Sequence, residues 1–463
     1  MIPLSLADVA TIVGAKLHGD PEAVVDGPVV TDARECGPGS LFVARVGEHA
    51  DGHDYVPQAV ERGAVAALVT RPVEGLASLV VDDVQAAFEA LARGVVDRLP
   101  DLTVVAVTGS SGKTSTKDLL AQVLSELGPT VAARESYNSE VGVPLTVLQV
   151  RPDTRYLVVE MGARGVGHIA HATRVVPPDV SVVLNVGSAH LGEFGSVEAV
   201  ADAKSELVRG LRPDALAVLN ADDPRVRAMA ASTRARVALV GQSADAAVRA
   251  EDVQLDDQAR AAFVLRVGGR SAPVRLALHG EHHVGNALAV AAVALELGMD
   301  LDDVAAALGH GRPVSRWRME VTERPDGVTV VNDAYNANPE SMRAALKALV
   351  AMGRGRRTWA VLGEMLELGA DSVAEHDAIG RMAVRLDVSR LVAVGAGARA
   401  LHTGAVMEGS WGEESMHVPD LDAAYQLLQR ELREGDVVLL KSSRDAGLRA
   451  LGDRLANGGE VRA

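Results

Sequence analysis

The chain has 463 residues and a formal net charge of −16, with no basic block to offset its acidic side chains. This length suggests about three domains of ordinary size, and the charge argues against nucleic acid as the main partner. Cys36 is the single cysteine, which excludes an intramolecular disulfide and a cysteine-based zinc site. The sequence shows no secretory signal and no apolar run of membrane-spanning length, which predicts a cytoplasmic protein without membrane insertion.

Residues 1–99 are predicted to form a small α/β domain. Apolar runs at 41–44 and 65–69 indicate strands, and the pattern at 84–96 indicates a helix. Pro100-Asp101 then marks a domain boundary.

The most informative stretch opens the second domain. A β-branched strand pattern at 103–107 runs into a glycine-rich turn, and an apolar helical pattern begins near Leu119. Strand, glycine-rich turn and helix in this order are typical of a phosphate-binding loop, whose backbone N–H groups hold phosphate oxygens at a helix N-terminus. The predicted nucleotide-binding residues are Thr108, Gly109, Ser110, Ser111, Gly112, Lys113 and Thr114.

Two side chains of this loop have specific expected roles. Lys113 is expected to neutralise phosphate charge, and the Thr114 hydroxyl is expected to hold Mg²⁺. Only two residues separate Gly109 from Gly112, whereas the common loop has four between its glycines. The alternative is a Gly/Ser turn that happens to precede Lys-Thr, but the flanking strand and helix favour a loop for a nucleoside triphosphate.

Residues 100–312 alternate strands and helices. Strands are expected at 103–107, 156–160, 180–186 and 216–219, which predicts a mainly parallel sheet covered on both faces. A polar alternating stretch at 247–278 predicts an antiparallel excursion, and the Ala/Val-rich helix at 284–297 is expected to be buried.

Three residues of this domain suggest metal chemistry. Glu160 ends a strand, where ligands of open α/β sheets gather, and its carboxylate suits Mg²⁺. His190 also follows a strand, although a single loop histidine is more often structural. Lys204 lies inside the apolar stripe of a helix, where a lowered pKa would leave a neutral amine able to bind CO₂ as a carbamate. A lysine at the edge of the stripe, reaching water, remains the alternative.

Residues 313–463 repeat the alternation, with strands at 328–331, 358–362, 391–394 and 437–440 that predict a Rossmann-like domain. Asn338 and Pro339 fit a helix N-terminus, but capping does not explain the nearby Asp333, Tyr335 and Asn336. The segment Gly395-Ala396-Gly397 lacks a convincing acidic ribose partner, so NAD is not expected.

Taken together, these motifs resemble the Mur ligase family, ATP-dependent amide-forming enzymes of bacterial cell-wall synthesis, over nearly the whole chain. The short loop 108–114 matches the family's form of the phosphate loop. Within the family, the run Asp-Ala-Tyr-Asn-Ala-Asn-Pro at 333–339 is most similar to the MurF type, and the Asp-Asn-Pro-Arg motif of the ligase that adds the third residue is absent. Further matching segments lie at 42–44, 51–55, 142–144, 363–365 and 441–444.

The resemblance implies a role for each domain. The first would hold the UDP part of the substrate near Thr31, Asp32 and Arg34, and Asn138 would also contact substrate. The second would hold ATP and two Mg²⁺ ions, one on Thr114 and Glu160 and the other on His190 and carbamylated Lys204. Asn286, Arg316 and Asp333 would contact ATP, and the last domain would place D-alanyl-D-alanine with Tyr335, Asn336 and Asn338. Lys113, Lys204 and His190 would be the catalytic residues.

The implied reaction joins D-alanyl-D-alanine to UDP-N-acetylmuramoyl-tripeptide through an acyl phosphate, giving UDP-MurNAc-pentapeptide, ADP and phosphate for peptidoglycan synthesis. The enzyme is expected to act as a monomer. Three alternatives stay open: a Mur-type ligase for another amino acid, a nucleotide-dependent switch, and a kinase, for which no separate general base stands out. The sequence leaves open whether the third peptide residue is diaminopimelate or lysine.

Overall fold

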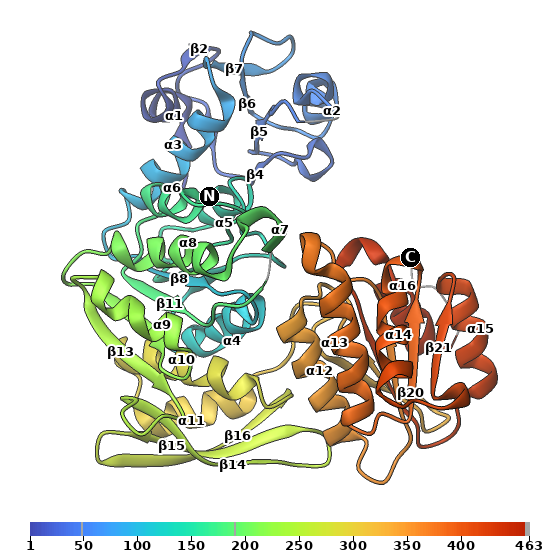
Figure 1. Ribbon diagram of the computed structural model, residues 1–463. Helices are drawn as coiled ribbons and strands as arrows, with labels where there is room; N and C mark the ends of the chain where they lie inside the picture. Colours follow the sequence, from blue (N-terminus) through green and yellow to red (C-terminus); the bar gives the residue numbers. More distant parts are fainter. Residues whose placement is uncertain (48–49, 189–190, 459–463) are drawn as a thin grey trace.

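The computed structural model describes residues 1–47, 50–188 and 191–458. It has three large sheets with helices packed on them, one in each successive part of the chain (Figure 1). The predicted α/β class with three such units is confirmed. The predicted domain boundaries at 99/100 and 312/313 fall between these sheets and remain predictions.

The N-terminal unit contains a five-stranded sheet and a small two-stranded one. The larger sheet has the order β2 (Lys16–His18), β7 (Ala77–Val80), β6 (Ala66–Val69), β5 (Leu41–Val43) and β4 (Val29–Val30). The smaller sheet pairs β1 (Leu4–Ser5) with β3 (Val24–Val25). Three helices accompany them: α1 (Leu6–Val13), α2 (Val56–Glu61) and α3 (Val84–Val96).

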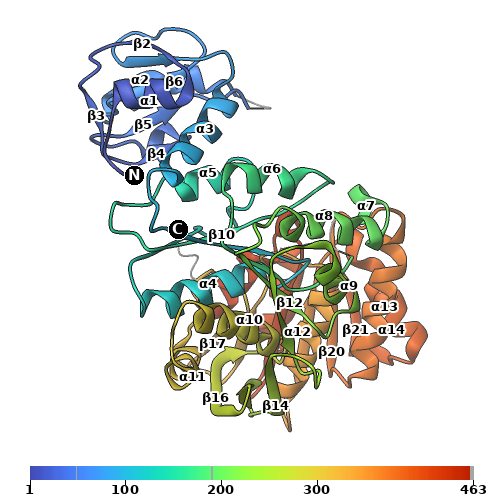
Figure 2. The ribbon, with the colours of Figure 1, turned by 90° about the vertical axis from the view of Figure 1, so that its left-hand side faces the viewer.

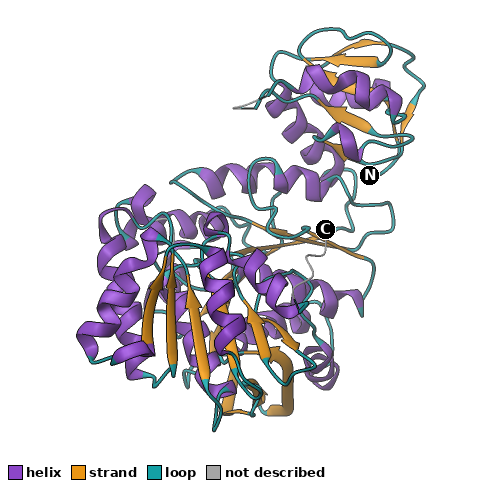
Figure 3. Ribbon diagram, turned by 90° about the vertical axis from the view of Figure 1, so that its right-hand side faces the viewer, coloured by secondary structure: helices purple, strands orange, loops and turns teal. Residues whose placement is uncertain are grey.

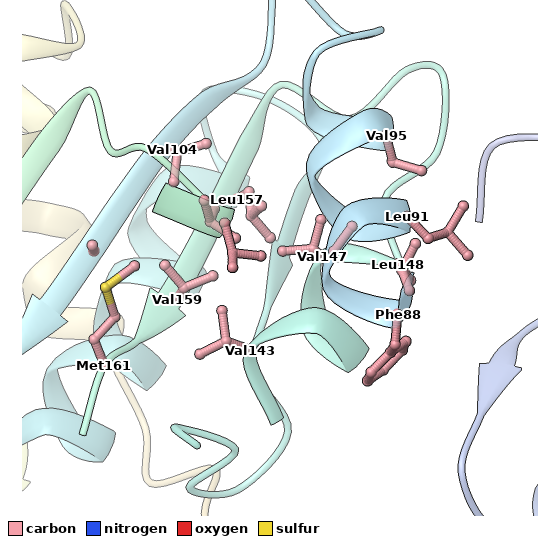
Figure 4. Close-up of a cluster of buried hydrophobic side chains, with 14 of the residues drawn as sticks. Phe88, Leu91, Val95, Val104, Val143, Val147, Leu148, Leu157, Val159 and Met161 are labelled. Atoms are coloured by element: carbon pink, nitrogen blue, oxygen red, sulfur yellow. The ribbon is translucent and has the colours of Figure 1, made fainter. Parts of the chain in front are cut away.

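Helix α3 joins this unit to the next one. Its buried side chains Phe88, Leu91 and Val95 lie against Val147 and Leu148 of the following unit (Figure 4). A single apolar cluster therefore runs from the N-terminal sheet into the central unit. Figure 2 shows α5 and α6 next to the N-terminal unit, and α3 contacts both of these helices.

The central unit is a nine-stranded sheet. Six parallel strands come first: β9 (Thr130–Ala132), β10 (Tyr156–Glu160), β8 (Thr103–Thr108), β11 (Val180–Val183), β12 (Leu216–Asn220) and β13 (Arg236–Gly241). The antiparallel pairs among β14 (Val248–Leu255), β15 (Arg260–Val267) and β16 (Arg270–His279) complete it, which confirms the antiparallel excursion. The strand expected at 180–186 ends earlier, at Val183, because the following residues turn to contact the loop after β8.

Helices cover both faces of this sheet, as the alternation predicted. The helices are α4 (Lys113–Ser125), α5 (Gly142–Val147), α6 (His168–Val175), α7 (Leu191–Phe194), α8 (Val197–Arg209), α9 (Pro224–Ala228), α10 (His283–Glu296) and α11 (Leu301–His310). Val104 and Ala106 of β8 point into the cluster shared with the N-terminal unit, whereas Val105 and Val107 point into the cluster formed with α10. The expected burial of α10 is confirmed.

The C-terminal unit is a six-stranded sheet between two helical layers (Figure 3). Its order is β17 (Glu320–Glu323), β18 (Thr329–Asn332), β22 (Val437–Lys441), β19 (Thr358–Leu362), β20 (Arg390–Val394) and β21 (Ser415–Val418). Only β17 is antiparallel to its neighbour. Two apolar clusters fill the faces, with helices α12 (Pro339–Met352), α13 (Ser372–Arg385), α14 (Arg399–Glu408), α15 (Leu421–Glu431) and α16 (Leu448–Ala456).

Two further observations bear on the sequence predictions. A Cβ atom at Gly397 would lie 2.1 Å from the Glu364 carboxylate, so any other residue there would require the Glu364 side chain to move. Across the described ranges, every helix is too short or too polar to cross a membrane.

Candidate active site

A cavity of about 1020 Å³ lies where the central and C-terminal units face each other, with Glu89 of α3 at its margin. Most of the predicted site residues line it. These are Ser110, Ser111, Gly112, Lys113, Thr114, Asn138, Glu160, Lys204, Asn286, Asp333, Tyr335, Asn336 and Asn338. The sheet's strand ends and the start of α4 therefore bring together segments that are far apart in the sequence.

The loop between β8 and α4 has the form that phosphate binding requires. Gly112 precedes α4 with φ of +80°, and a Cβ atom there would lie 2.8 Å from Asn286 Oδ1. The Lys113 ammonium donates a hydrogen bond to the Gly109 carbonyl at 2.7 Å. Burial lowers the pKa of Lys113, and the nearby Arg318 cation lowers it further while Glu160 opposes the shift. An anion stabilises a partly desolvated ammonium of this kind, so the loop fits a phosphate group.

Asn185 fixes the shape of this loop. Its Oδ1 accepts a hydrogen bond from the Ser111 N–H at 2.9 Å, and its Nδ2 donates to the Ser111 carbonyl at 3.1 Å. The Ser110 N–H also donates to the Asn185 carbonyl at 3.1 Å. Sequence reasoning gave Asn185 no role, although an amide just past a buried strand was the available signal.

Glu160 and Thr114 meet beside the loop, as the metal prediction requires. Glu160 is almost fully buried, and its Oε2 accepts a hydrogen bond from Thr114 Oγ1 at 2.9 Å. Its Oε1 accepts a hydrogen bond from Asn138 Nδ2 at 2.6 Å. Because Mg²⁺ usually takes one or two protein oxygens and completes its shell with phosphate and water, this pair fits such an ion.

Lys204 lies on α8 and faces the same cavity. Its residue exposure is only 4%, and burial lowers its pKa to about 7, with a further contribution from the Lys113 charge. These values support a lysine that lies inside the apolar stripe of the helix, and not one at the edge of the stripe that extends into water. His190, the second predicted ligand of this metal, lies outside the described residues.

The predicted nucleotide contact Arg316 does not line the cavity. It pairs with Asp453 at 3.0 Å, and its guanidinium lies over the Trp317 ring. Arg318 lines the cavity instead, where its Nη2 donates to Thr114 Oγ1 at 3.2 Å and to Ser136 Oγ at 3.0 Å. Its Nε is buried and has no hydrogen-bond partner among the described residues, so a ligand oxygen could satisfy it.

The segment after β18 forms the opposite wall. Asp333 accepts a hydrogen bond from Lys441 Nζ at 2.6 Å, and Lys441 also donates to the Asn336 carbonyl at 3.0 Å. The guanidinium groups of Arg318 and Arg444 lie 4.2 Å and 5.7 Å from the centre of the Tyr335 ring. This wall therefore carries both an aromatic face and cations.

The remaining predicted residues lie elsewhere. Thr108 and Gly109 belong to the phosphate loop, but they lie behind the lining of the cavity. Thr31, Asp32 and Arg34 are in the N-terminal unit outside the cavity, where the Asp32 carboxylate pairs with the Arg34 guanidinium at 2.6 Å.

The sequence and the structure of this chain are similar to those of known proteins over nearly its whole length. Three family models match consecutive parts of the chain: the Mur ligase catalytic domain at 28–108, the Mur ligase middle domain at 107–294 and the glutamate ligase domain at 317–444. A Mycobacterium tuberculosis protein named UDP-N-acetylmuramoyl-tripeptide–D-alanyl-D-alanine ligase is 49% identical over 98% of each chain.

The chain belongs to the Mur ligase family. An Escherichia coli relative with the same name is 36% identical over 97% of each chain. Among solved Mur ligases, MurF from Acinetobacter baumannii has a TM-score of 0.89 and 32% identity, covering 98% of this chain and 99% of its own. MurF from Thermotoga maritima, solved in complex with ADP, has a TM-score of 0.81 and 28% identity, covering 95% and 99% of the two chains.

Proposed function

We propose that this chain joins D-alanyl-D-alanine to UDP-N-acetylmuramoyl-tripeptide at the expense of ATP, forming UDP-MurNAc-pentapeptide, ADP and phosphate. The observation that carries the proposal is that a phosphate loop of the central unit faces the Asp333–Asn338 segment across one cavity. Relatives that match nearly the whole chain carry the name of this activity. We also propose that the enzyme acts as a monomer.

When bound, ATP with Mg²⁺ supplies the phosphoryl group that converts the peptide's terminal carboxylate into an acyl phosphate, which the dipeptide amine then attacks. Two anions must approach each other in the first step. Lys113 offsets their repulsion, and Arg318 Nε, which has no hydrogen-bond partner within the described ranges, can donate to a phosphate oxygen. We assign to Arg318 the nucleotide contact that was predicted for Arg316, and keep Asn286 and Asp333 in that role.

We propose two metal positions beside the phosphate loop. Thr114 and Glu160 would hold the first Mg²⁺. The second would be held by His190 and by Lys204 as its carbamate, which forms when the neutral amine adds to CO₂ and releases one proton. The buried position and lowered pKa of Lys204 support this modification.

The substrates would extend away from the phosphate loop on both sides. Thr31, Asp32 and Arg34 would hold the UDP part, and Asn138 would lie near the reacting end of the peptide. Tyr335, Asn336 and Asn338 would help to place D-alanyl-D-alanine on the C-terminal wall. The cations near Tyr335 are suited to the dipeptide carboxylate.

A panel of donors and acceptors tests the proposal. Purified protein is incubated with ATP, Mg²⁺ and either UDP-MurNAc-dipeptide or UDP-MurNAc-tripeptide, each with D-alanyl-D-alanine, diaminopimelate or lysine. The expected amide product, identified by mass, forms only from a tripeptide donor and D-alanyl-D-alanine. A product formed only from the dipeptide donor and a single amino acid would instead indicate another Mur-type ligase. Comparing tripeptide donors that end in diaminopimelate and in lysine identifies the third residue.

A further inference from the structure

The first turn of α12 contacts the central unit beside the phosphate loop. Glu340 Oε1 accepts a hydrogen bond from the Ser188 N–H at 3.0 Å, and both Glu340 oxygens lie 3.1 Å from Ser188 Oγ, which donates to them. The two residues are 152 positions apart in the sequence and belong to different units. The Glu340 carboxylate thus accepts hydrogen bonds from two donors of Ser188, across the boundary between the two units.

This contact is tied directly to the phosphate loop. The Gly187 N–H, next to Ser188, donates to Ser110 Oγ at 2.8 Å, and Asn338 Nδ2 donates to the Ser110 carbonyl at 3.3 Å. A Cβ atom at Gly187 would lie 2.6 Å from the carboxyl carbon of Glu340. The start of α12 is therefore bonded both to the phosphate loop and to the segment that supports it.

A second contact holds the two units together at another place. The Gly192 N–H of α7 donates to the Glu367 carbonyl at 3.0 Å, and α7 packs against the short turn Gly369–Asp371 (Figure 1). A Cβ atom at Gly192 would lie 3.0 Å from the Gly369 nitrogen. The first contact uses the Glu340 carboxylate as its acceptor, whereas the second contact includes a hydrogen bond between backbone groups.

We infer that Glu340 is a positioning residue that keeps the C-terminal unit closed over the phosphate loop while the acyl phosphate is present. The inference rests on the proposed function. An acyl phosphate that meets water yields the carboxylate and inorganic phosphate, so ATP is consumed without amide formation. Loss of the contact would let the C-terminal unit, which carries the proposed dipeptide site, move away from the phosphate loop. The dipeptide amine would then compete less well with water for the acyl phosphate.

The test compares Glu340→Ala and Glu340→Gln with the wild-type enzyme. Phosphate and UDP-MurNAc-pentapeptide are measured in the same reactions, over a range of dipeptide concentrations. For Glu340→Ala we expect the KM for D-alanyl-D-alanine to rise about tenfold and phosphate to exceed amide severalfold. Glu340→Gln keeps one acceptor oxygen and should give an intermediate ratio of phosphate to amide.

Glu375→Gln is the matched control. Glu375 pairs with Arg343 at 2.9 Å within the C-terminal unit and does not line the cavity. This variant should release one phosphate per amide, as the wild type does. Ser188→Ala removes the partner hydroxyl, and its effect should be less than additive with Glu340→Ala because both changes break the same contact.

Three results would overturn the inference. The first is a folded Glu340→Ala enzyme, judged by its melting curve, with unchanged KM and one phosphate per amide. The second is a fall in the KM for the UDP-tripeptide, which would mean that Glu340 blocks a substrate carboxylate. The third applies if Glu340→Ala does not fold: it is a wild-type ratio of phosphate to amide in both Glu340→Gln and Ser188→Ala. A wild-type enzyme that forms no amide from the dipeptide contradicts the proposed function instead.

Discussion

Two lysine side chains, Lys113 and Lys204, give the cavity its electrostatic character. Lys204 is buried and Lys113 is half-buried, and desolvation is the main cause that lowers the pKa of each. The Lys113 charge also lowers the pKa of Lys204, so the two ammonium groups disfavour each other. Two neighbouring lysines favour a polyanionic ligand, and the lowered pKa of Lys204 makes its ammonium easy to deprotonate.

The first prediction concerns Lys113. Lys113→Ala should lower the rate of ADP formation by at least about 100-fold, because no other side chain of the loop can neutralise the transferred phosphoryl group. The control is Lys347→Ala, on an exposed position of α12. Near-normal turnover by the Lys113 variant would remove the loop from the mechanism.

The second prediction concerns Lys204 and pH. Its pKa is about 7 in the folded protein and 10.5 ordinarily. Below about pH 7 the amine is charged in both states, and its burial penalises the folded one. Between about 7 and 10.5 only the unfolded state is charged, so this group makes stability rise with pH.

Lys204→Met should therefore raise the melting temperature most at about pH 6, and the gain should shrink toward about pH 9. Melting curves in CO₂-free buffer measure this difference without carbamate formation. A gain that does not change with pH would contradict the lowered pKa. With ¹³C-bicarbonate, wild-type protein should show a carbamate signal by NMR that Lys204→Met lacks.

At the residue level, the sequence indicated which side chains carry chemistry better than it indicated which of them face the cavity. The loop 108–114, Glu160 and Lys204 were identifiable because strand ends and a helical stripe constrain them. The sequence could not show which of Arg316 and Arg318 faces the phosphate loop. The intervening Trp317 and the following Met319 have φ of +58° and +51°. These left-handed conformations, rare for such residues, decide which arginine turns toward the phosphate loop.

Among the elements, α3 has the widest structural effect. Its residue Phe88 is fully buried in the cluster that joins the N-terminal and central units (Figure 4). Phe88→Ala should lower the free energy of unfolding by about 3–5 kcal/mol through lost burial and a cavity. Chemical denaturation measures this change, with Ala86→Ser on the exposed side of α3 as the control.

If the two units share one core, the Phe88 variant should also unfold them in a single transition at lower denaturant concentration. Unchanged stability would mean that the interface relaxes around the missing ring. A new, separate transition would mean that the N-terminal unit has an independent core.

The elements that escaped sequence prediction are short or partly exposed. β9 has three residues, none of them fully buried, and lies at the sheet edge. β17 begins and ends with glutamate and pairs only with β18. Local apolar patterns mark strands that are buried on both faces, such as β8 and β10, whereas tertiary pairing creates these edge strands.

The arrangement of the whole molecule could not be predicted from the sequence. Arg318 and Thr114 are 204 residues apart, and nothing in either local pattern indicates that they meet. The same holds for Glu340 and Ser188, which are bonded across the units. The resemblance to Mur ligases implied that the last domain would place D-alanyl-D-alanine, and the contacts show which side chains bond the central and C-terminal units to each other.

In this arrangement, residues of the phosphate loop and of the segment 333–338 line the same cavity. Under the proposed function, the peptide's terminal carboxylate is activated by phosphoryl transfer before the amide forms. Activation of this kind moves one carboxylate oxygen into the released phosphate. A hydrolysing switch would instead place a water oxygen there.

The most direct measurement follows that oxygen. UDP-MurNAc-tripeptide labelled with ¹⁸O in its terminal carboxylate is converted with ATP and D-alanyl-D-alanine, and phosphate and pentapeptide are analysed by mass spectrometry. We expect one ¹⁸O atom in each phosphate released per amide formed, and no phosphate release when the tripeptide is omitted. Phosphate that carries only solvent oxygen, or that forms equally fast without the tripeptide, would contradict this expectation.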